Sequence, residues 1–161
     1  MSDYRIGHGY DIHPLVVGRP FIIGGREIPF DKGLQGHSDG DVLTHAIIDS
    51  ILGALSLGDI GQHFPDTDES FKNAYSLDLL RKIARLLNER NYAVSNIDTT
   101  IVCQAPKLST HYPFMKGNIA ANLNIATTQI SVKAKTKESL GDVGQGHAVE
   151  AYAVTLLHTI D

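Results

Sequence analysis

Residues 4–13 read YRIGHGYDIH and residues 37–45 read HSDGDVLTH. The first stretch predicts a strand, and a strand returns side chains to one face at every second residue, so Asp11 and His13 can point toward one spot. The second stretch leads into a predicted helix at about residues 39–56, on which His45 can face that strand. One carboxylate and two imidazoles suit a tetrahedral Zn²⁺ that keeps its fourth position for substrate, the pattern of a catalytic zinc.

A simpler role for the Asp-x-His pair is a turn or a hydrogen-bonded pair that holds no metal. The surrounding sequence favours metal binding. Half of the eight histidines fall within the first 45 residues, and aspartates lie among them. These residues are His8, His13, His37 and His45, with Asp11, Asp39 and Asp41.

The length and charge of the chain limit what it can be. Its 161 residues suit one domain spanning residues 1–161, and no segment approaches the roughly 18 consecutive apolar residues of a membrane span. A net charge of −4 argues against nucleic acid as a partner, because phosphate backbones need a basic face. The single cysteine, Cys103, excludes an internal disulfide. With no secretory leader pattern, we expect a cytoplasmic protein.

Hydrophobic patterning predicts an α+β fold, a mixed four-stranded sheet with helices on one face and a β-hairpin. The expected strands are 4–13, 94–104, 130–136 and 148–159, and the hairpin is 19–29. The expected helices are 39–56, one capped by Ser76, and one from Ser109 or Pro113 to Leu123. Residues 57–69 predict a long ordered loop. Periodicity does not separate a strand from a buried helix at 148–159, and we favour a strand. The uncovered sheet face predicts self-association.

Two further groups could carry chemistry. Gln104–Lys107 ends a strand just before a helix, so backbone amides and one ammonium could receive an anion or a nucleobase, although such segments are more often ordinary turns. Thr136 and Glu138 are two residues apart in a lysine-rich run. If the strand continues that far, they share one side and suit a Mg²⁺-bridged phosphate, whereas a charged run is usually a solvated face. Cys103 is expected to be buried rather than nucleophilic.

Six motifs occur in order along nearly the whole chain. They are GHGYDIH (7–13), HSDGD (37–41), LGDIG (57–61), FPDTD (64–68), QAPK (104–107) and TKESLG (136–141). On these motifs the chain resembles the 2-C-methyl-D-erythritol 2,4-cyclodiphosphate synthases, phosphorus–oxygen lyases of non-mevalonate isoprenoid (terpenoid) biosynthesis. The resemblance implies a homotrimer with sites at its interfaces. It also implies conversion of 4-diphosphocytidyl-2-C-methyl-D-erythritol 2-phosphate to the 2,4-cyclodiphosphate and CMP.

The resemblance also implies roles for particular residues. One Zn²⁺ per subunit would be held by Asp11, His13 and His45, with the substrate β-phosphate in its open position, and one Mg²⁺ or Mn²⁺ by Glu138. The catalytic residues would be His37, Thr136 and Glu138. Phosphate would contact His37 and Ser38, and the methylerythritol hydroxyls would contact Asp59, Gly61, Phe64, Pro65 and Asp66. Cytidine would contact Cys103, Ala105, Pro106, Lys107, Leu108, Ser109, Ala134, Lys135 and Thr136 of the adjacent subunit.

Two rival functions stay open at this point. A zinc-dependent phosphohydrolase would use the same ligands to activate water, with Asp39 or Asp41 as its base. These aspartates are equally explained as residues at a helix start or as partners of the ligating histidines. A trimeric metal-binding module without turnover is the alternative that is not an enzyme.

Overall fold

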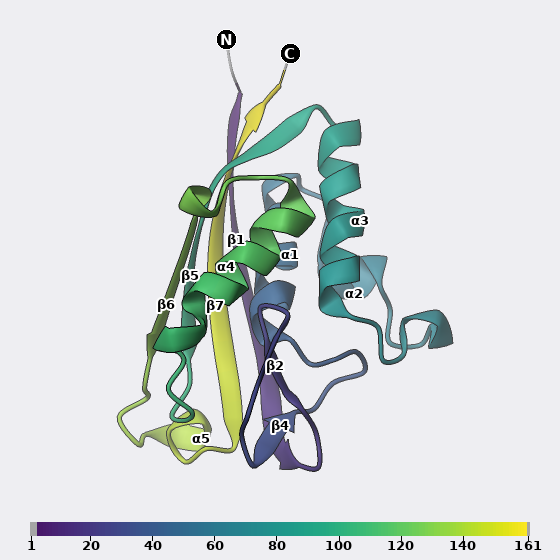
Figure 1. The fold of residues 1–161 in the computed structure, drawn as a ribbon. Coiled ribbons are helices and arrows are strands. Elements are labelled where there is room, and N and C mark those ends of the chain that lie inside the picture. The colour runs from purple at the N-terminus through teal and green to yellow at the C-terminus, as the bar shows by residue number, and fades with distance from the viewer. Residues whose placement is uncertain (1–2, 161) are drawn as a thin grey trace.

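A five-stranded sheet organises the chain in the computed structural model, which describes residues 3–160 (Figure 1). The strand order is β4-β1-β7-β5-β6, and only the β5–β6 pair is parallel. The sheet strands are β1 (Tyr4–Val17), β4 (Lys32–Leu34), β5 (Tyr92–Val102), β6 (Ile130–Lys135) and β7 (Ala148–Thr159). The predicted α+β class and mixed sheet are confirmed, and so is the strand assignment of the last element.

The prediction of four sheet strands is wrong, because β4 is a fifth strand. It is only three residues long and shows no alternating pattern of its own. It pairs with the end of β1, which continues to Val17 instead of stopping at the expected His13. A separate hairpin forms as expected from β2 (Phe21–Ile23) and β3 (Arg26–Ile28). Its turn residues, Gly24 and Gly25, have φ of 57° and 67°, which favour glycine.

Three longer helices and several short ones complete the fold. The longer helices are α1 (Val42–Ala54), α3 (Ser76–Glu89) and α4 (Tyr112–Leu123). The short ones are α2 (Ile60–His63), η1 (Glu69–Phe71), η2 (Ser109–His111), η3 (Thr127–Gln129) and α5 (Gly141–Gly144). The expected loop at 57–69 therefore contains α2 and the first residue of η1. None of the helices in residues 3–160 is long and apolar enough to cross a membrane.

Burial alternates along the central strands, which shows that the helices pack on one sheet face. In β7 the side chains of Ala151, Ala153 and Thr155 are almost fully buried, whereas Tyr152 and Val154 between them are exposed. The same alternation in β1 leaves Ile6 71% exposed. The other face of the sheet thus presents a row of large apolar side chains: Tyr4, Ile6, Tyr10, Ile12, Tyr152 and Val154. We call this row the open face.

Two glycines of β1 let α1 lie directly on the strand. A Cβ added at Gly7 would be 1.8 Å from the carbonyl oxygen of Ser50, and one at Gly9 would be 1.9 Å from that of Ala46. No side chain fits at either position, so both must be glycine for the helix to approach this closely. Because Ala46 follows His45 directly, this approach also brings His45 to the strand that carries Asp11.

The start of α3 differs from the prediction. Ser76 is the first helical residue rather than the cap, and Tyr75 at the cap position makes no side-chain cap hydrogen bond. At α1 the cap is Asp41, so this helix begins at Val42, later than residue 39. The buried Cys103 lies just beyond β5, which ends at Val102.

Candidate metal centre and two pockets

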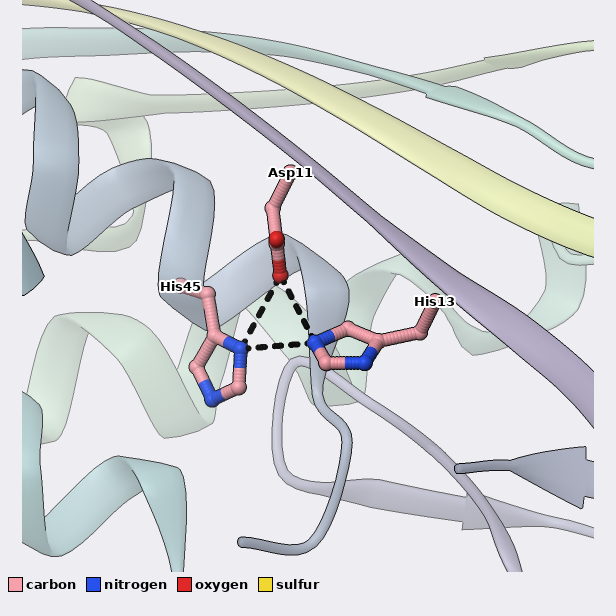
Figure 2. A group of neighbouring side chains, drawn as sticks. All are labelled: Asp11, His13 and His45. Atoms are coloured by element: carbon pink, nitrogen blue, oxygen red, sulfur yellow. Dashed lines mark hydrogen bonds and ion pairs between the residues drawn. The ribbon is translucent and has the colours of Figure 1, made fainter. Parts of the chain in front are cut away.

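Asp11, His13 and His45 form a close triangle between β1 and α1 (Figure 2). Asp11 Oδ2 lies 2.9 Å from His13 Nε2 and 3.0 Å from His45 Nδ1, and the two ring nitrogens are 3.1 Å apart. The sequence predicts these three residues as a ligand set, and the structure brings one ligand atom of each to the same point. Two imidazole nitrogens and one carboxylate oxygen therefore converge.

Asp41 holds the helix that carries His45. Its buried carboxylate accepts hydrogen bonds from the backbone amides of Gly24, Gly25 and Thr44 at 2.7–3.0 Å. It thereby joins the hairpin turn to the first turn of α1. This position explains Asp41 as a structural residue at a helix start.

Hydrogen bonds on the far side of each ring orient the two histidines. His13 Nδ1 donates to the Gln35 carbonyl at 2.6 Å, which leaves Nε2 for the triangle. His45 turns Nδ1 to the triangle and places Nε2 2.7 Å from Ser76 Oγ and 3.1 Å from Ser38 Oγ. Metal-binding histidines are commonly oriented in this way.

The triangle also shifts the pKa values of two of its members. Burial opposes the charged form of Asp11, but hydrogen bonds from His13 and His45 outweigh it and lower the Asp11 pKa to about 2. Burial likewise opposes the charged form of His13, but its contact with Asp11 raises the His13 pKa above its ordinary value. The carboxylate is thus ionised near neutral pH, as a metal ligand must be.

The donor set fits a zinc ion. Three atoms bound at about 2.1 Å to a tetrahedral ion lie about 3.4 Å apart. The sides of the triangle are 2.9–3.1 Å long. The three ligand atoms therefore need to move apart by only a few tenths of an ångström to admit the ion. Neutral imidazole and carboxylate are also the ligand types of catalytic zinc sites.

A pocket of about 390 Å³ opens beside the triangle, and we call it the metal pocket. Eight residues of the predicted site line it: Asp11, His13, His37, Ser38, His45, Gly61, Phe64 and Asp66. Asp59 and Pro65 are not part of its lining. Asp59 instead caps α2 by accepting the Gln62 amide at 3.0 Å. Three apolar lining residues were not predicted, namely Ile60, Phe71 and Leu79. They come from separate elements, and a sequence pattern marks them only as ordinary core.

A second pocket of about 300 Å³, which we call the loop pocket, lies at the ends of β5 and β6. It contains all nine residues predicted for cytidine: Cys103, Ala105, Pro106, Lys107, Leu108, Ser109, Ala134, Lys135 and Thr136. Gln104 and Tyr112 line it as well, and Tyr112 was not predicted. The expectation that Cys103 is buried is confirmed, and burial raises the pKa of its thiol to about 11.

Thr136 and Glu138 are in contact, but not for the predicted reason. Thr136 Oγ1 donates to Glu138 Oε1 at 3.1 Å. The strand ends at Lys135, and the chain then turns with positive φ at Glu138 (52°) and Ser139 (62°). The condition that strand geometry continues to Glu138 is therefore not met. Glu138 is exposed and lies outside the group of Asp11, His13 and His45.

Core residues separate the two pockets within the chain. Asp11, Ala151, Ile101 and Ala134 are successive partners across β1, β7, β5 and β6. Three strand spacings put the ends of this row about 14 Å apart. The two middle residues, Ala151 and Ile101, are fully buried. The space between the metal pocket and the loop pocket is thus filled along this row.

These features define the chain as an α+β protein with a candidate metal site formed by three side chains. The YgbB family profile matches residues 4–158, and the chain belongs to this family. A 2-C-methyl-D-erythritol 2,4-cyclodiphosphate synthase of Clostridium perfringens is 56% identical over 153 residues, which cover 95% of this chain and 98% of that protein. The Burkholderia lata protein of the same name is 53% identical over 155 residues, 96% of each chain.

Solved structures of similar proteins share the fold. The bifunctional IspDF from Campylobacter jejuni matches with a TM-score of 0.96 and 39% identity over 100% of this chain. This chain spans only 44% of that larger protein. The Plasmodium falciparum IspF CDP complex matches with a TM-score of 0.87 and 40% identity, covering 98% of this chain and 97% of that one.

Proposed function

We propose that the chain is a 2-C-methyl-D-erythritol 2,4-cyclodiphosphate synthase. It converts 4-diphosphocytidyl-2-C-methyl-D-erythritol 2-phosphate to 2-C-methyl-D-erythritol 2,4-cyclodiphosphate and CMP, in the non-mevalonate isoprenoid pathway. The observation that carries this proposal is the Asp11, His13 and His45 triangle, which opens on the metal pocket. Relatives of that name, at least 53% identical over at least 95% of the chain, support it. Residues 1–161 then form a single synthase domain.

The reaction needs positioning and charge neutralisation rather than a nucleophilic side chain. An oxygen of the 2-phosphate forms a bond to the β-phosphorus, and the bond from the β-phosphorus to the oxygen of the CMP phosphate breaks. CMP leaves with that electron pair. The attacking phosphate is already anionic near neutral pH, so no strong base is required.

The lining of the metal pocket supplies the positioning. Asp11, His13 and His45 would hold Zn²⁺, which would polarise a phosphate oxygen as a Lewis acid. His37 and Ser38 lie on the pocket wall, where an imidazole and a hydroxyl can donate to phosphate oxygens. Gly61, Phe64 and Asp66, with Asp59 and Pro65 beside them, would hold the methylerythritol hydroxyls.

The loop pocket would take the cytidine end of the substrate. Its floor contains the buried Cys103 and Leu108, and its rim contains the exposed Lys107, Lys135 and Thr136. Glu138, which accepts the Thr136 hydroxyl, would hold one Mg²⁺ or Mn²⁺ against the substrate phosphates. The solved Plasmodium falciparum relative described as a CDP complex supports a cytidine nucleotide as the ligand.

A homotrimer would complete each site by placing the loop pocket of one subunit against the metal pocket of the next. Two observations support this arrangement. The core separates the two pockets of one chain, and the open face presents six large apolar side chains that need a cover. A symmetric ring of identical subunits supplies both the cover and the neighbouring pocket.

A charge on the open face tests the trimer. Ile6→Lys places an ammonium where the trimer would bury an isoleucine, so we expect sedimentation as a monomer and loss of CMP release. Val17→Lys is the matched control, because Val17 lies on the same strand and is 80% exposed. A trimeric Ile6→Lys variant with normal activity would contradict this use of the open face.

Product analysis tests the reaction. Purified protein with Zn²⁺ and Mg²⁺ should release CMP and a cyclic diphosphate from the cytidine-linked substrate, identified by phosphorus NMR and mass spectrometry. An acyclic product would indicate the phosphohydrolase, and the absence of any product would indicate a binding module.

The structure gives the hydrolase no base among the suggested residues. Asp41 is saturated by hydrogen bonds at the start of α1, Asp39 is bonded to Ser76, and neither lines the metal pocket.

A further inference from the structure

We propose that Ser76 and Asp39 form a positioning relay that fixes the tautomer of His45. The relay would keep a hydrogen on His45 Nε2 and so present the lone pair of Nδ1 to the metal. It deepens the proposed function, because it rests on His45 being a metal ligand. Ser76 is the first residue of α3, far from the ligand motifs in sequence, and nothing in those motifs points to it.

The Ser76 hydroxyl has its hydrogen committed to Asp39. Ser76 Oγ donates to Asp39 Oδ1, while the Ser76 amide donates to Asp39 Oδ2 at 2.9 Å. Asp39 Oδ1 also accepts the backbone amide of Asp41 at 3.1 Å. Both carboxylate oxygens thus receive backbone N–H groups, so both act as acceptors. The one hydroxyl hydrogen of Ser76 therefore points at Asp39.

A hydroxyl in this state can only accept a hydrogen bond from its other side. His45 Nε2 lies 2.7 Å from Ser76 Oγ, so the imidazole must donate there. In a neutral imidazole whose Nδ1 lone pair is taken by a metal, the hydrogen resides on Nε2, and Ser76 is placed to accept it. Nδ1 is the His45 atom that faces Asp11 and His13 in the triangle.

Burial makes the relay hard to replace by water. Ser76 is fully buried, and His45 and Asp39 are 8% and 9% exposed. The other ligating histidine is oriented differently, since His13 Nδ1 donates to the backbone carbonyl of Gln35. The tautomer of His45 therefore depends on side chains that substitution can remove, whereas that of His13 does not.

The relay also determines what Ser38 can do. Ser38 Oγ lies 3.1 Å from His45 Nε2. With a hydrogen on that nitrogen, Ser38 cannot donate to it, so its own hydroxyl hydrogen stays available to an anion in the metal pocket. One buried carboxylate thus orders a metal ligand and a pocket hydroxyl together.

Ser76→Ala tests the relay through metal binding. We expect zinc affinity, measured by competition with a chelator, to fall about 10- to 100-fold, the usual cost of losing an outer partner of a metal ligand. Ser76→Thr, which keeps a hydroxyl, should recover most of the affinity. Ser50→Ala is the matched control, because Ser50 is another fully buried serine on a helix, bonded to Thr155 rather than to the triangle.

The hydrogen on His45 Nε2 provides a second test. Nitrogen–proton NMR of the zinc-loaded protein should show a His45 Nε2 hydrogen that exchanges slowly with water, and Ser76→Ala should make this exchange markedly faster. An Nε2 hydrogen that exchanges at the same rate in both proteins overturns the relay. So does unchanged zinc affinity in Ser76→Ala, or an equal loss in Ser50→Ala.

The two proposals can fail separately. A wild-type protein that binds zinc with Nε2–H on His45 but releases no CMP contradicts the proposed function and supports the relay. A wild-type protein that cyclises its substrate, with a Ser76→Ala variant that keeps full zinc affinity, contradicts the relay alone.

Discussion

The metal pocket and the loop pocket differ in how completely one chain builds them. In the metal pocket, both histidines of the triangle have a hydrogen-bond partner on the far side of the ring, and the helix that carries His45 lies on β1 and is tied to the hairpin. At the loop pocket, Lys107 and Thr136 of the lining are exposed, and so is the neighbouring Glu138, whose carboxylate bonds only to Thr136 among the described residues. The first pocket is preorganised, whereas the second has exposed polar groups that a subunit of the proposed trimer would cover.

Removing a ligand should have the largest effect. His45→Ala leaves two protein ligands, so we expect CMP release to fall to background and zinc affinity to fall by more than the roughly 100-fold that loss of an outer partner costs. Folding should survive, because the substitution deletes polar contacts rather than core. His158→Ala is the control, since His158 lies on β7 and hydrogen-bonds Ser95 of β5, not a residue of the triangle. Full zinc content with normal turnover in His45→Ala would show that the triangle is not the metal centre.

Glu138→Gln should impair the Mg²⁺ site proposed beside the loop pocket and leave the metal pocket unchanged. A neutral amide is a weaker ligand for a hard divalent cation, so we expect a shifted Mg²⁺ dependence and roughly 10- to 100-fold slower CMP release with zinc still bound. Glu89→Gln, at the exposed end of α3, is the matched control. Parallel loss of zinc and magnesium from Glu138→Gln would mean that the two pockets are not independent.

The contrast between the pockets also explains what the sequence could predict. Asp11 and His13 follow from the period of a strand, and His45 follows from a helix that two glycines bring to that strand. The relay does not follow, because Ser76 reads as a helix cap while its partner lies 37 residues away. Glu138 was predicted beside Thr136 from strand geometry, but a turn makes the contact. Strand β4 was missed because only its pairing with β1 defines it.

Mixing two inactive variants should show whether the pockets of different chains combine. His45→Ala lacks a proposed metal ligand, and Lys107→Ala lacks one of the two lysine ammonium groups of the loop pocket. In random trimers formed by co-refolding at equal amounts, about one quarter of the interfaces pair two intact halves, so about one quarter of wild-type activity should return. Native mass spectrometry would verify mixed trimers. No recovery in verified mixed trimers would place each complete site within one chain.

The smallest effect concerns pH and the metal pocket. His13 must lose its proton to bind zinc, and its contact with Asp11 raises its pKa despite burial. Zinc affinity should therefore fall close to tenfold per pH unit below that pKa.

The metal-free protein should show the opposite trend in stability. A raised His13 pKa contributes stability that is fully present below its ordinary value of 6.5 and is lost as the pH rises through the folded-state pKa. Asp11 has the opposite dependence, because its pKa is lowered on folding. Its contribution to stability is present above pH 3.8 and is lost as the pH falls toward about 2. When the pH is raised from about 6 to about 8, the urea concentration at the unfolding midpoint should thus fall for the zinc-free protein and rise for the zinc-bound protein. Asp11→Asn removes the carboxylate that raises the His13 pKa, so it should flatten the metal-free trend. An unchanged trend in that variant would show that Asp11 does not control His13.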